Sequence, residues 1–446
     1  MVGTLRFRRR MIAAGVFLLA VGAVGLLGWA QVATTRSAGS VALVYEKAKP
    51  TDPIARLQKQ IDDGTIKLAF EKEHGFLPAV LKALNIPASS QGLVFSKTSF
   101  QRDAIMPWQP RALYFNMDTY VGWVQTGRLL EVASVDKDLG TVFYTLEQYP
   151  TEKPRFERQG ADCLQCHDGS MTGGVPGLIV RSAFTDAGGS PMLTIPNYLT
   201  SSGSPFSERW GGWYVTGKTG AMKHMGNMII HAGDNPKTAN LLENADLSDL
   251  TGKFDTEPYL SGGSDLVSLL VLTHQTEVHN VITKVNYELR GIQHLMVTAK
   301  KAGGAAATAR VVGEAAPSPE RVREVCEPLV EALLFCDEVP LPNAVAGTTT
   351  FVQEFVAGGI KDKQGRSLRE LDLKMRVFKY PCSYLIYSDG FNALPAEAKE
   401  YVYQRLFDVL TGKETGEEFK HLSPADRGAI LEILKGTVKD LPGYWR

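Results

Sequence analysis

Cysteine is scarce in this chain, net charge is absent, and two common catalytic motifs are missing. Only five of the 446 residues are cysteine, and 48 basic side chains balance 48 acidic ones. A balanced charge creates no strong field for a polyanion, so binding of nucleic acid is not expected. Neither a His-Glu-x-x-His zinc motif nor a Gly-x-Ser-x-Gly nucleophile elbow occurs. These absences argue against a zinc protease and a serine hydrolase, and they direct attention to the few cysteines.

Two of the cysteines belong to the most specific pattern in the chain, Cys163-Leu164-Gln165-Cys166-His167. Thiols separated by two residues can reach the two vinyl groups on one edge of a porphyrin, and an imidazole directly after them can bind the iron. The pentapeptide resembles the haem-attachment sequence of the c-type cytochromes. This resemblance implies one covalent haem c, with Cys163 and Cys166 as thioether cysteines and His167 as the proximal iron ligand.

A zinc site and a redox-active dithiol are the alternatives for this cysteine pair. Structural zinc needs four suitably spaced ligands, whereas the other three cysteines are single and distant. A thioredoxin-like pair usually opens a helix after a strand, whereas residues 155–159 are charged and polar. Both features favour haem. Cys326 and Cys336 fall in one helical pattern about 15 Å apart, beyond the ~7 Å reach of a disulfide, so these two are expected to be buried free thiols. Cys382 is expected to be a buried thiol in an aromatic strand, with a reactive thiol as the alternative.

The N-terminal segment, residues 1–33, has the layout of a signal peptide or a membrane anchor. Four arginines precede an uncharged apolar run from Met11 to Ala30. A helix of this length would span about 30 Å, enough to cross a bilayer, and Gly28-Trp29-Ala30 offers small residues for cleavage. Export to the periplasm is therefore expected, either with a cleaved signal or with an anchor in the inner membrane. Haem attachment in bacterial c-type cytochromes takes place on that side of the membrane.

Residue patterns predict an α+β fold in which a β-rich, haem-bearing region with a long helix (34–308) precedes a mostly α-helical C-terminal region (318–446). Runs rich in β-branched and aromatic residues predict strands, at 93–95, 111–115, 120–124, 129–135 and 141–146. Capping and periodic signals predict helices, at 53–62, 76–84, from 264 to about 302–307, from 319 with a kink at Pro328, at 395–410 and at 424–436. Residues 313–319 are expected to form a linker.

The long helix should present one apolar stripe. Ser264 is the expected N-cap, with Asp265 in the first turn. From Val267 to Met296 the apolar residues recur at steps of three and four, which confines them to a stripe about 100° wide. His274 lies at the centre of this stripe, whereas His279 lies well off it.

The sixth iron ligand decides between electron transfer and catalysis, because a methionine ligand suits electron transfer and an open position permits chemistry. Met225 is the first candidate, since it follows His167 at a distance over which a cytochrome loop can return. His274 is the second, because a histidine within an apolar stripe needs a partner, and His224 is the third. The sequence offers three further methionines: Met192, Met222 and Met228.

Three functions are compatible with these features. The first is an exported electron-transfer protein that exchanges electrons with a redox partner protein. The overall texture of the chain resembles that of large exported bacterial monohaem proteins of unassigned activity, a likeness that implies no substrate. The second is a haem enzyme, such as a peroxidase or a small-molecule oxidoreductase, with His274, His279 or Arg290 as a distal acid, base or charge stabiliser. The third is a haem-bearing sensor or assembly partner that docks through its C-terminal helices.

Overall fold

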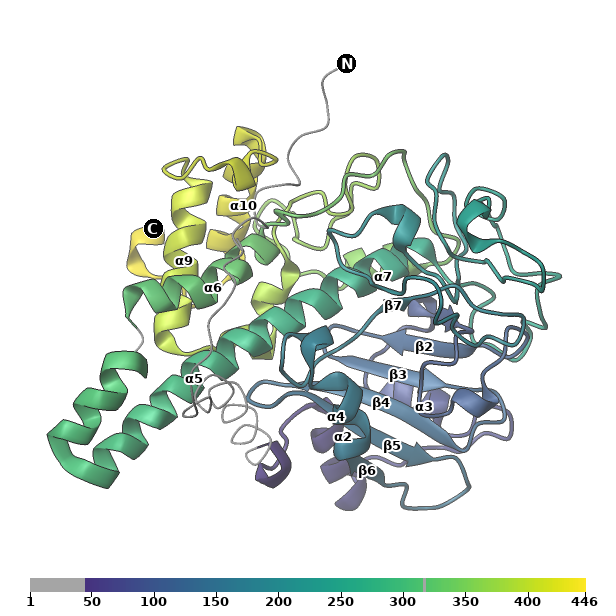
Figure 1. Cartoon of the computed structure of the whole chain (residues 1–446), viewed down its shortest axis with the longest axis horizontal. Coiled ribbons are helices and arrows are strands. Elements are labelled where there is room, and N and C mark those ends of the chain that lie inside the picture. The colour runs from purple at the N-terminus through teal and green to yellow at the C-terminus, as the bar shows by residue number, and fades with distance from the viewer. Residues whose placement is uncertain (1–44, 316–317) are drawn as a thin grey trace, which may run out of the picture.

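A computed structural model describes residues 45–315 and 318–446 of the chain. The predicted signal or anchor, residues 1–33, lies outside the described residues. Among the residues that are described, no helix is both long enough and apolar enough to cross a membrane. The fold belongs to the α+β class, as predicted: an antiparallel sheet and its covering helices come first, and the C-terminal part is mostly helical (Figure 1).

The principal sheet has seven strands in the order β6-β5-β4-β3-β2-β1-β9, and every neighbouring pair is antiparallel. Its strands are β1 (Gly92–Val94), β2 (Arg111–Phe115), β3 (Thr119–Trp123), β4 (Leu129–Asp136), β5 (Gly140–Glu147), β6 (Phe156–Gln159) and β9 (Trp213–Tyr214). A second sheet pairs β7 (Arg181–Ser182) with β8 (Tyr198–Leu199). All five strands predicted from sequence are present within one or two residues of their expected bounds.

Helices form a layer on each face of the sheet and a further layer at the C-terminal end. They are α2 (Pro53–Asp62), α3 (Leu77–Ala83), α4 (Ala161–His167), α5 (Leu266–Ala315), α6 (Pro319–Leu333), α7 (Phe351–Ala357), α8 (Asp389–Asn392), α9 (Ala396–Leu410) and α10 (Pro424–Thr437). Two short 3-10 helices, η1 (Ala88–Ser90) and η3 (Ser170–Thr172), lie near the sites described below.

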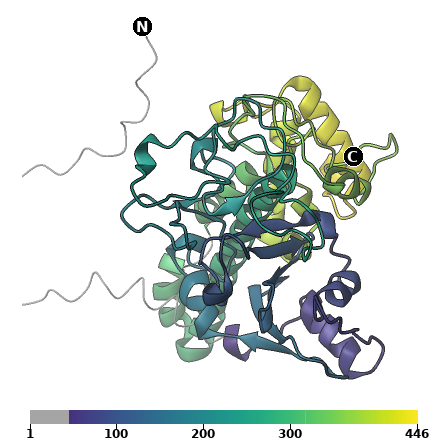
Figure 2. The same ribbon diagram turned by 90° about the vertical axis from the view of Figure 1, so that its right-hand side faces the viewer.

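The two faces of the sheet have different partners because side chains alternate between them. On one face, Tyr114, Val132 and Tyr144 are buried in a core that also contains Ile54 of α2 and Val80 of α3. The opposite face points toward α5 and α4. Figure 2 shows the sheet edge-on, with the N-terminal helices on one side and α5 on the other.

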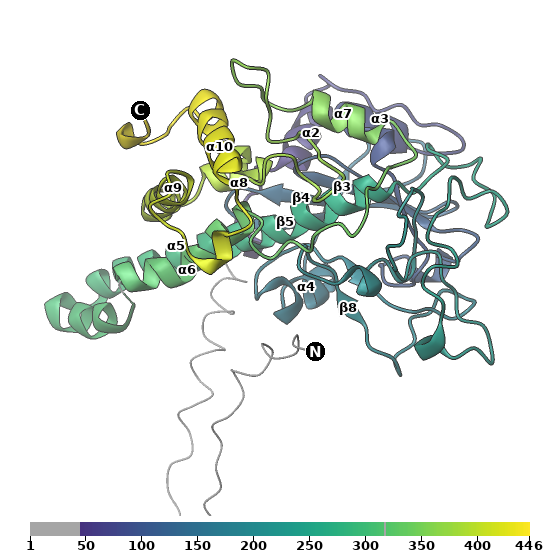
Figure 3. The ribbon, with the colours of Figure 1, turned by 90° about the horizontal axis from the view of Figure 1, so that it is seen from above.

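Helix α5 lies between the sheet and the C-terminal helices, and this position corrects two predictions about it. Residues 263–276 are all buried, so the first turns of α5 are buried on every side rather than along one stripe. In Figure 3, α5 runs from the strands β3, β4 and β5 toward α6 and α9. The N-cap is Asp265, whose Oδ1 accepts the amides of Val267 and Ser268 at 2.8 and 3.1 Å, whereas Ser264 Oγ accepts the amide of Leu93. The sequence pattern identified the correct turn but placed the cap one residue early.

The polar residues of α5 that lie off the predicted stripe are bonded to the loops of the sheet. Gln275 donates to the carbonyl of Asn116 at 2.7 Å, and Asn286 donates to the carbonyl of Lys137 at 2.8 Å. His279 is buried among these contacts, although the periodicity placed it away from the apolar stripe. A buried helix must satisfy its polar side chains, and here the turns of neighbouring strands provide the partners.

The C-terminal end of α5 also differs from the prediction. The helix continues to Ala315 instead of ending near residues 302–307, and α6 begins at Pro319, so most of the expected linker is helical. Residues 316 and 317, and the side chains of Ile292 and Met296, lie outside the described part of the structure. The predicted caps of α6 and α10 are confirmed, since Ser318 and Ser423 accept amide hydrogen bonds within their first turns, and α6 continues through Pro328.

Candidate functional site

Helix α4 carries the complete pentapeptide on its last two turns. Cys163 and Cys166 are three residues apart in the helix, so both thiols project from the same side. Cys163 is half-buried, Cys166 is exposed, and both are free. Burial, together with the nearby charges of Glu131 and Asp162, raises the pKa of the Cys163 thiol to about 11. This thiol is therefore protonated at neutral pH, unlike the thiolates of redox-active dithiols.

The imidazole of His167 is oriented by a hydrogen bond at one nitrogen. Its Nδ1–H donates to the carbonyl oxygen of Gly177 at 2.8 Å, and its ring packs on Phe143 with centroids 4.6 Å apart. Burial lowers the pKa of His167, and the bond to Gly177 opposes that shift. A carbonyl can only accept, so the neutral ring carries its proton on Nδ1. Nε2 has no hydrogen-bond partner among the described residues, and this nitrogen is the one available to a metal.

The loop after α4 folds back and forms hydrogen bonds with both the backbone and the side chain of His167. The amide of Gly177 donates to the carbonyl of His167 at 2.9 Å, while its own carbonyl accepts from the ring. Asn280 of α5 fixes the next residue, Leu178, by accepting its amide at 2.8 Å and donating to its carbonyl at 2.7 Å. A Cβ on Gly177 would lie 2.5 Å from Asn280 Oδ1, so only glycine allows this approach.

Part of the sheet face beside α4 is not covered by a helix. Leu113, Ala133 and Thr145 are half-exposed, although their neighbours on the opposite face are buried. Figure 1 shows α4 beside β4 and β5, with α5 running past the other part of the sheet. Together with Phe143, these side chains form a mostly apolar floor next to the pentapeptide.

One ion pair lies on this floor. Arg111 donates to Glu131 at 2.8 Å, and the charge of Arg111 lowers the pKa of His167 while that of Glu131 raises it. The Nε atom of Arg111 is buried and has no hydrogen-bond partner. The ion pair is therefore close enough to the imidazole to tune it electrostatically.

None of the three candidate sixth ligands has a hydrogen bond or ring contact to the pentapeptide among the described residues. Met225 is buried, and its sulfur accepts a hydrogen bond from Ser182 at 3.6 Å. His224 uses both ring nitrogens, since Nδ1 accepts the Gly226 amide and Nε2 donates to the Ala245 carbonyl. His274 of α5 faces the C-terminal region, bonded to Ser383 at 2.8 Å and stacked on Phe335. Ligation by any of these three residues stays a prediction.

Burial makes both candidate histidines poor bases. It lowers the pKa of His224 to about 4 and that of His274 to about 3. The rival methionines differ in exposure: Met222 is buried, whereas Met192 and Met228 are half-buried. Met171, which the sequence analysis did not consider, lies in η3 immediately after the pentapeptide and is 37 % exposed. Its position four residues after His167 is the one feature of the sequence that could have marked Met171 as a candidate ligand.

The residues proposed for a distal role in an enzyme are bonded to other parts of the fold. His279 Nε2 donates to the carbonyl of Met117 at 2.7 Å, and its Nδ1 is buried without a partner. Arg290 forms an ion pair with Asp138 and donates to the carbonyl of Ala393 at 3.0 Å. Both side chains therefore connect α5 to its neighbours.

Residues 212–219, Gly-Trp-Tyr-Val-Thr-Gly-Lys-Thr, match the spacing of a phosphate-binding loop, a pattern that the sequence analysis overlooked. In the structure this segment contains β9, and no helix follows it directly. The amides that would have to bind phosphate already donate elsewhere: Thr216 to the carbonyl of Ser264, Gly217 to that of Leu247 and Lys218 to that of Ala346. The segment therefore does not form a phosphate cradle.

The other cysteines are free. Cys326 and Cys382 are buried, as expected, but Cys336 is only half-buried. It also lies beyond the end of α6, in a turn where its amide donates to the carbonyl of Glu331. The expected single helical pattern for Cys326 and Cys336 was therefore wrong. No group of three or more His, Cys, Asp and Glu side chains in the described residues is arranged to hold a metal ion.

Comparison with known proteins found no relative of this chain. No protein-family model matches the chain, and no similar curated protein or solved structure was found.

Proposed function

We propose that this chain is an exported c-type haem protein that transfers electrons, with one haem c attached through Cys163 and Cys166 and ligated by His167. One observation carries the proposal. Two free thiols project from one side of α4, and the adjoining imidazole commits Nδ1 to Gly177 while Nε2 has no partner within the part of the chain that the structure describes. A histidine that ligates a metal typically donates its other N–H to such a carbonyl.

The residues around α4 fit a haem. The floor of Leu113, Ala133 and Phe143 offers an apolar surface, and the unpartnered Nε of Arg111 offers a donor suited to a carboxylate. Haem, when bound, supplies a one-electron iron couple whose potential depends on axial ligands, hydrogen bonding and burial. The chain's own contribution is to hold the imidazole neutral and oriented, and to place the Arg111–Glu131 pair beside it.

Electron transfer is favoured over catalysis by the contacts of the candidate distal residues. His279 Nε2 and Arg290 are bonded to main-chain carbonyls of other segments, and His274 is bonded to Ser383. All three side chains thus have structural partners, and the remaining nitrogen of His279, Nδ1, is buried. Cys166 is exposed, so the thioether that it would form lies at the surface. A redox partner protein could approach there, as electron exchange requires.

Met225 is the sixth ligand that we propose first, with His274 and His224 after it. Ligation by Met225 would cost a single hydroxyl–sulfur hydrogen bond from Ser182. Ligation by His224 would break one of two bonds that satisfy its ring, and ligation by His274 would remove its bond to Ser383. A buried polar group that loses its partner costs more than a weak sulfur contact.

The first experiment tests covalent haem in the full chain, expressed with its N-terminal segment and a haem-attachment system. A pyridine haemochrome spectrum typical of two thioether bonds, and colour that resists acid-acetone extraction, are expected. Cys163→Ala and Cys166→Ala should each weaken or abolish covalent attachment, whereas Cys336→Ser, which alters a cysteine in another part of the fold, should retain it. A wild-type protein that carries no covalent haem contradicts the proposal.

The second experiment separates a carrier from an enzyme. An electron-transfer protein should show a low-spin, six-coordinate spectrum that carbon monoxide and cyanide leave unchanged. Replacing Met225, His274 and His224 one at a time should convert the spectrum to high spin for one variant only, which identifies the ligand. A high-spin ferric spectrum in the wild-type protein would contradict the carrier function and favour the haem enzyme.

A further inference from the structure

One end of the principal sheet carries three loops whose bases lie side by side. They are residues 95–110, 124–128 and 148–155. The strand register brings them together, because the end of β1 pairs with the start of β2, the end of β3 with the starts of β2 and β4, and the end of β5 with the start of β4. A fourth loop, residues 183–197, adjoins them, since the amide of Lys97 donates to the carbonyl of Gly189 at 2.9 Å.

Four large apolar side chains on these loops are more than half exposed to solvent. They are Phe100 (61 %), Trp108 (60 %), Tyr149 (55 %) and Leu193 (85 %), and we call this surface the aromatic end. In the rest of the described structure, only one other large apolar side chain, Met375, is more than half exposed. Single exposed apolar residues are normal, whereas a concentration of them marks a surface that contacts something else.

Trp108 is the clearest sign that this exposure serves a contact. The other four tryptophans of the described structure are all buried, as is usual for a side chain of this size. Trp108 instead lies between two prolines, Pro107 and Pro110, on the first of the four loops. The proline rings limit the backbone freedom of this segment, so the indole is presented to solvent by a stiff support.

Hydrogen bonds between the loops hold the aromatic end together. Gln109 Nε2 donates to the hydroxyl of Thr126 at 3.2 Å, which joins the first loop to the second. The amide of Gln148 donates to the carbonyl of Arg128 at 2.8 Å, which joins the second loop to the third. Because the loops are fixed to one another, the exposed side chains can engage a surface together without a large loss of conformational entropy.

The loops of the aromatic end carry an excess of positive charge. Five basic residues, Lys97, Arg102, Arg128, Lys153 and Arg155, stand against three acidic ones, Asp103, Glu152 and Asp186, which gives a net charge of +2. The whole chain has a net charge of zero. The excess is therefore local, and it is complementary to a surface that carries negative charge.

This combination of side chains matches the chemistry of a membrane surface. Tryptophan and tyrosine prefer the level of the lipid headgroups, where one part of the ring system is apolar and another part is wet. Phenylalanine and leucine can enter the acyl boundary, while arginine and lysine are attracted to anionic headgroups. Side chains that protrude from separate loops also suit a fluid surface that can mould around each of them.

The length of the N-terminal chain is compatible with such a contact. The 14 residues 31–44 separate the apolar run that ends at Ala30 from the described body, which begins at Tyr45. Fully extended, they reach about 50 Å. Tyr45 is bonded to Thr141 at the start of β5, and a strand of eight residues measures about 27 Å. An N-terminal segment retained in a bilayer would therefore let the aromatic end, at the far end of β5, meet the same bilayer.

We propose that the aromatic end is a membrane-binding surface for a phospholipid bilayer with anionic headgroups. Phe100, Trp108 and Leu193 enter the boundary between headgroups and acyl chains, and Arg102 and Arg128 contact the phosphates. The proposal goes beyond electron transfer and does not depend on haem. It gives the protein a fixed orientation on the membrane.

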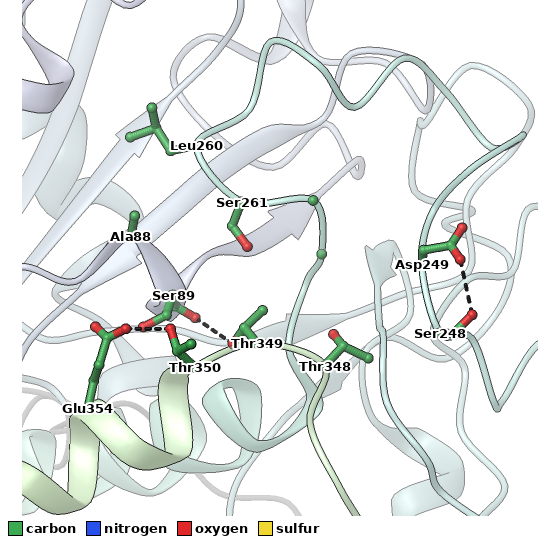
Figure 4. Close-up of a pocket in the computed structure, with 12 residues that line it drawn as sticks. Ala88, Ser89, Ser248, Asp249, Leu260, Ser261, Thr348, Thr349, Thr350 and Glu354 are labelled. Carbon is green, nitrogen blue, oxygen red and sulfur yellow. Dashed lines mark hydrogen bonds between the residues drawn. The ribbon is translucent and has the colours of Figure 1, made fainter.

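The opposite end of the sheet offers a comparison surface of different chemistry. A hollow there is lined by η1, which precedes β1, and by hydroxyl and carboxylate side chains that include Ser248, Asp249 and Glu354 (Figure 4). Ser248 is exposed. Acidic and hydroxyl groups gain nothing from entering an anionic bilayer, so a tryptophan placed at Ser248 is a suitable negative control.

Quenching of tryptophan fluorescence by brominated lipid tests the proposal. The full chain is mixed with vesicles of phosphatidylcholine and phosphatidylglycerol in which the acyl chains of phosphatidylcholine are brominated. The emission of Trp108 is the part that Trp108→Leu removes, and this part is expected to shift to shorter wavelength and to be quenched. Because the readout belongs to one residue, it reports contact of the aromatic end whether or not the N-terminal segment also inserts.

Variants of the aromatic end should reduce this quenching. The double variant Arg102→Gln/Arg128→Gln should reduce it about 3-fold or more, as should high salt, because both weaken the attraction to anionic lipid. Leu193→Ser should reduce it by a similar factor, because an apolar side chain no longer enters the bilayer. Met375→Ser makes a comparable change at an exposed side chain outside the aromatic end and should leave the quenching unchanged.

Three results would overturn the proposal. One is the absence of Trp108 quenching by brominated lipid in protein with normal circular dichroism, although aqueous iodide still quenches it. Another is equal quenching of a tryptophan introduced by Ser248→Trp in the Trp108→Leu chain, which would mean that the protein adheres to vesicles without a preferred face. The third is a dimer that Trp108→Ser dissociates while lipid leaves Trp108 unquenched, which would assign the aromatic end to a second copy of the chain. Haem content is not part of the readout, so failure here leaves the haem function untouched.

Discussion

The carboxamide of Asn280 holds the backbone of Leu178 by two hydrogen bonds, of 2.8 and 2.7 Å. The preceding residue, Gly177, accepts the Nδ1–H of His167. The long helix α5 therefore orients the imidazole of the pentapeptide without touching it. Asn280 is a positioning residue in the sense that it acts on His167 through the loop between them.

Replacing Asn280 with alanine should destabilise the protein by about 2 kcal/mol, because two main-chain groups of Leu178 lose their partners. Urea unfolding measures this change. In haem-loaded protein the reduction potential should also rise, since a loosened Gly177 polarises the imidazole less. Asn240→Ala, which alters an exposed asparagine that accepts only the amide of Leu242, serves as the control. An Asn280→Ala protein with unchanged stability and potential would show that the contact does not position His167.

Gly177→Ala should destabilise the protein by about 2 kcal/mol, as is usual when a side chain is forced into a packed site. The new Cβ would lie 2.5 Å from Asn280 Oδ1 and 2.9 Å from Thr172 Cβ. Gly169→Ala is the matched control, because it lies in the same loop, has φ −151° and has no atom within 4 Å of the added Cβ. Equal thermal stability of the two variants would contradict the close approach of the loop to α5.

The buried His274 should make the protein less stable in acid. Its pKa is lowered to about 3 by burial, whereas in the unfolded chain it is about 6.5. Its contribution to stability is therefore complete above pH 6.5 and is lost as the pH falls toward 3, because the unfolded state binds the proton first. At pH 5 this single group should cost about 2 kcal/mol relative to pH 7.5.

Comparison with His274→Gln, which keeps a hydrogen-bond donor for Ser383 but does not titrate, isolates this effect. The difference in unfolding free energy between wild type and variant should narrow by about 2 kcal/mol from pH 7.5 to pH 5. His231→Gln, which makes the same substitution at a solvent-exposed histidine, is the matched control variant. A constant difference between wild type and His274→Gln would mean that His274 is not buried in its neutral form.

The Arg111–Glu131 pair should modulate the pKa of His167 in protein without haem, on top of the larger effects of burial and of the hydrogen bond to Gly177. Because Arg111 lowers this pKa and Glu131 raises it, Arg111→Gln should raise the pKa of His167. Glu131→Gln should lower it, because a charge beside a titrating group favours the opposite sign. Histidine NMR titrations measure both changes. Arg155→Gln, at an exposed arginine paired with Glu157, should have no effect, and identical curves for all three variants would place the ion pair too far from the ring.

Local sequence signals predicted several elements closely, because those signals act within one or two turns. The bounds of α2 agree with the prediction, since Asp52 caps the helix and Pro53 begins it. The hairpin of β4 and β5 is also present, because a polar turn separates two runs of β-branched and aromatic residues. The α+β class followed from the order of such signals along the chain.

Predictions failed where burial depended on distant segments. Periodicity indicated one apolar stripe on α5, but α5 is buried on all sides at its start, where distant C-terminal segments contact it through Phe335 and Ser383. The polar residues Gln275 and Asn280 then bond to loops more than 100 residues earlier. No window of sequence contains that information.

The amino-acid sequence by itself determined the pentapeptide Cys163–His167 and the spacing of its thiols, because a single helical turn is a local structure. Only the tertiary structure decided which nitrogen of His167 is free, which loop carbonyl holds the other and which helix holds that loop. Those contacts join residues that are far apart along the chain, and they form only when the sheet, α4 and α5 pack together and desolvate them.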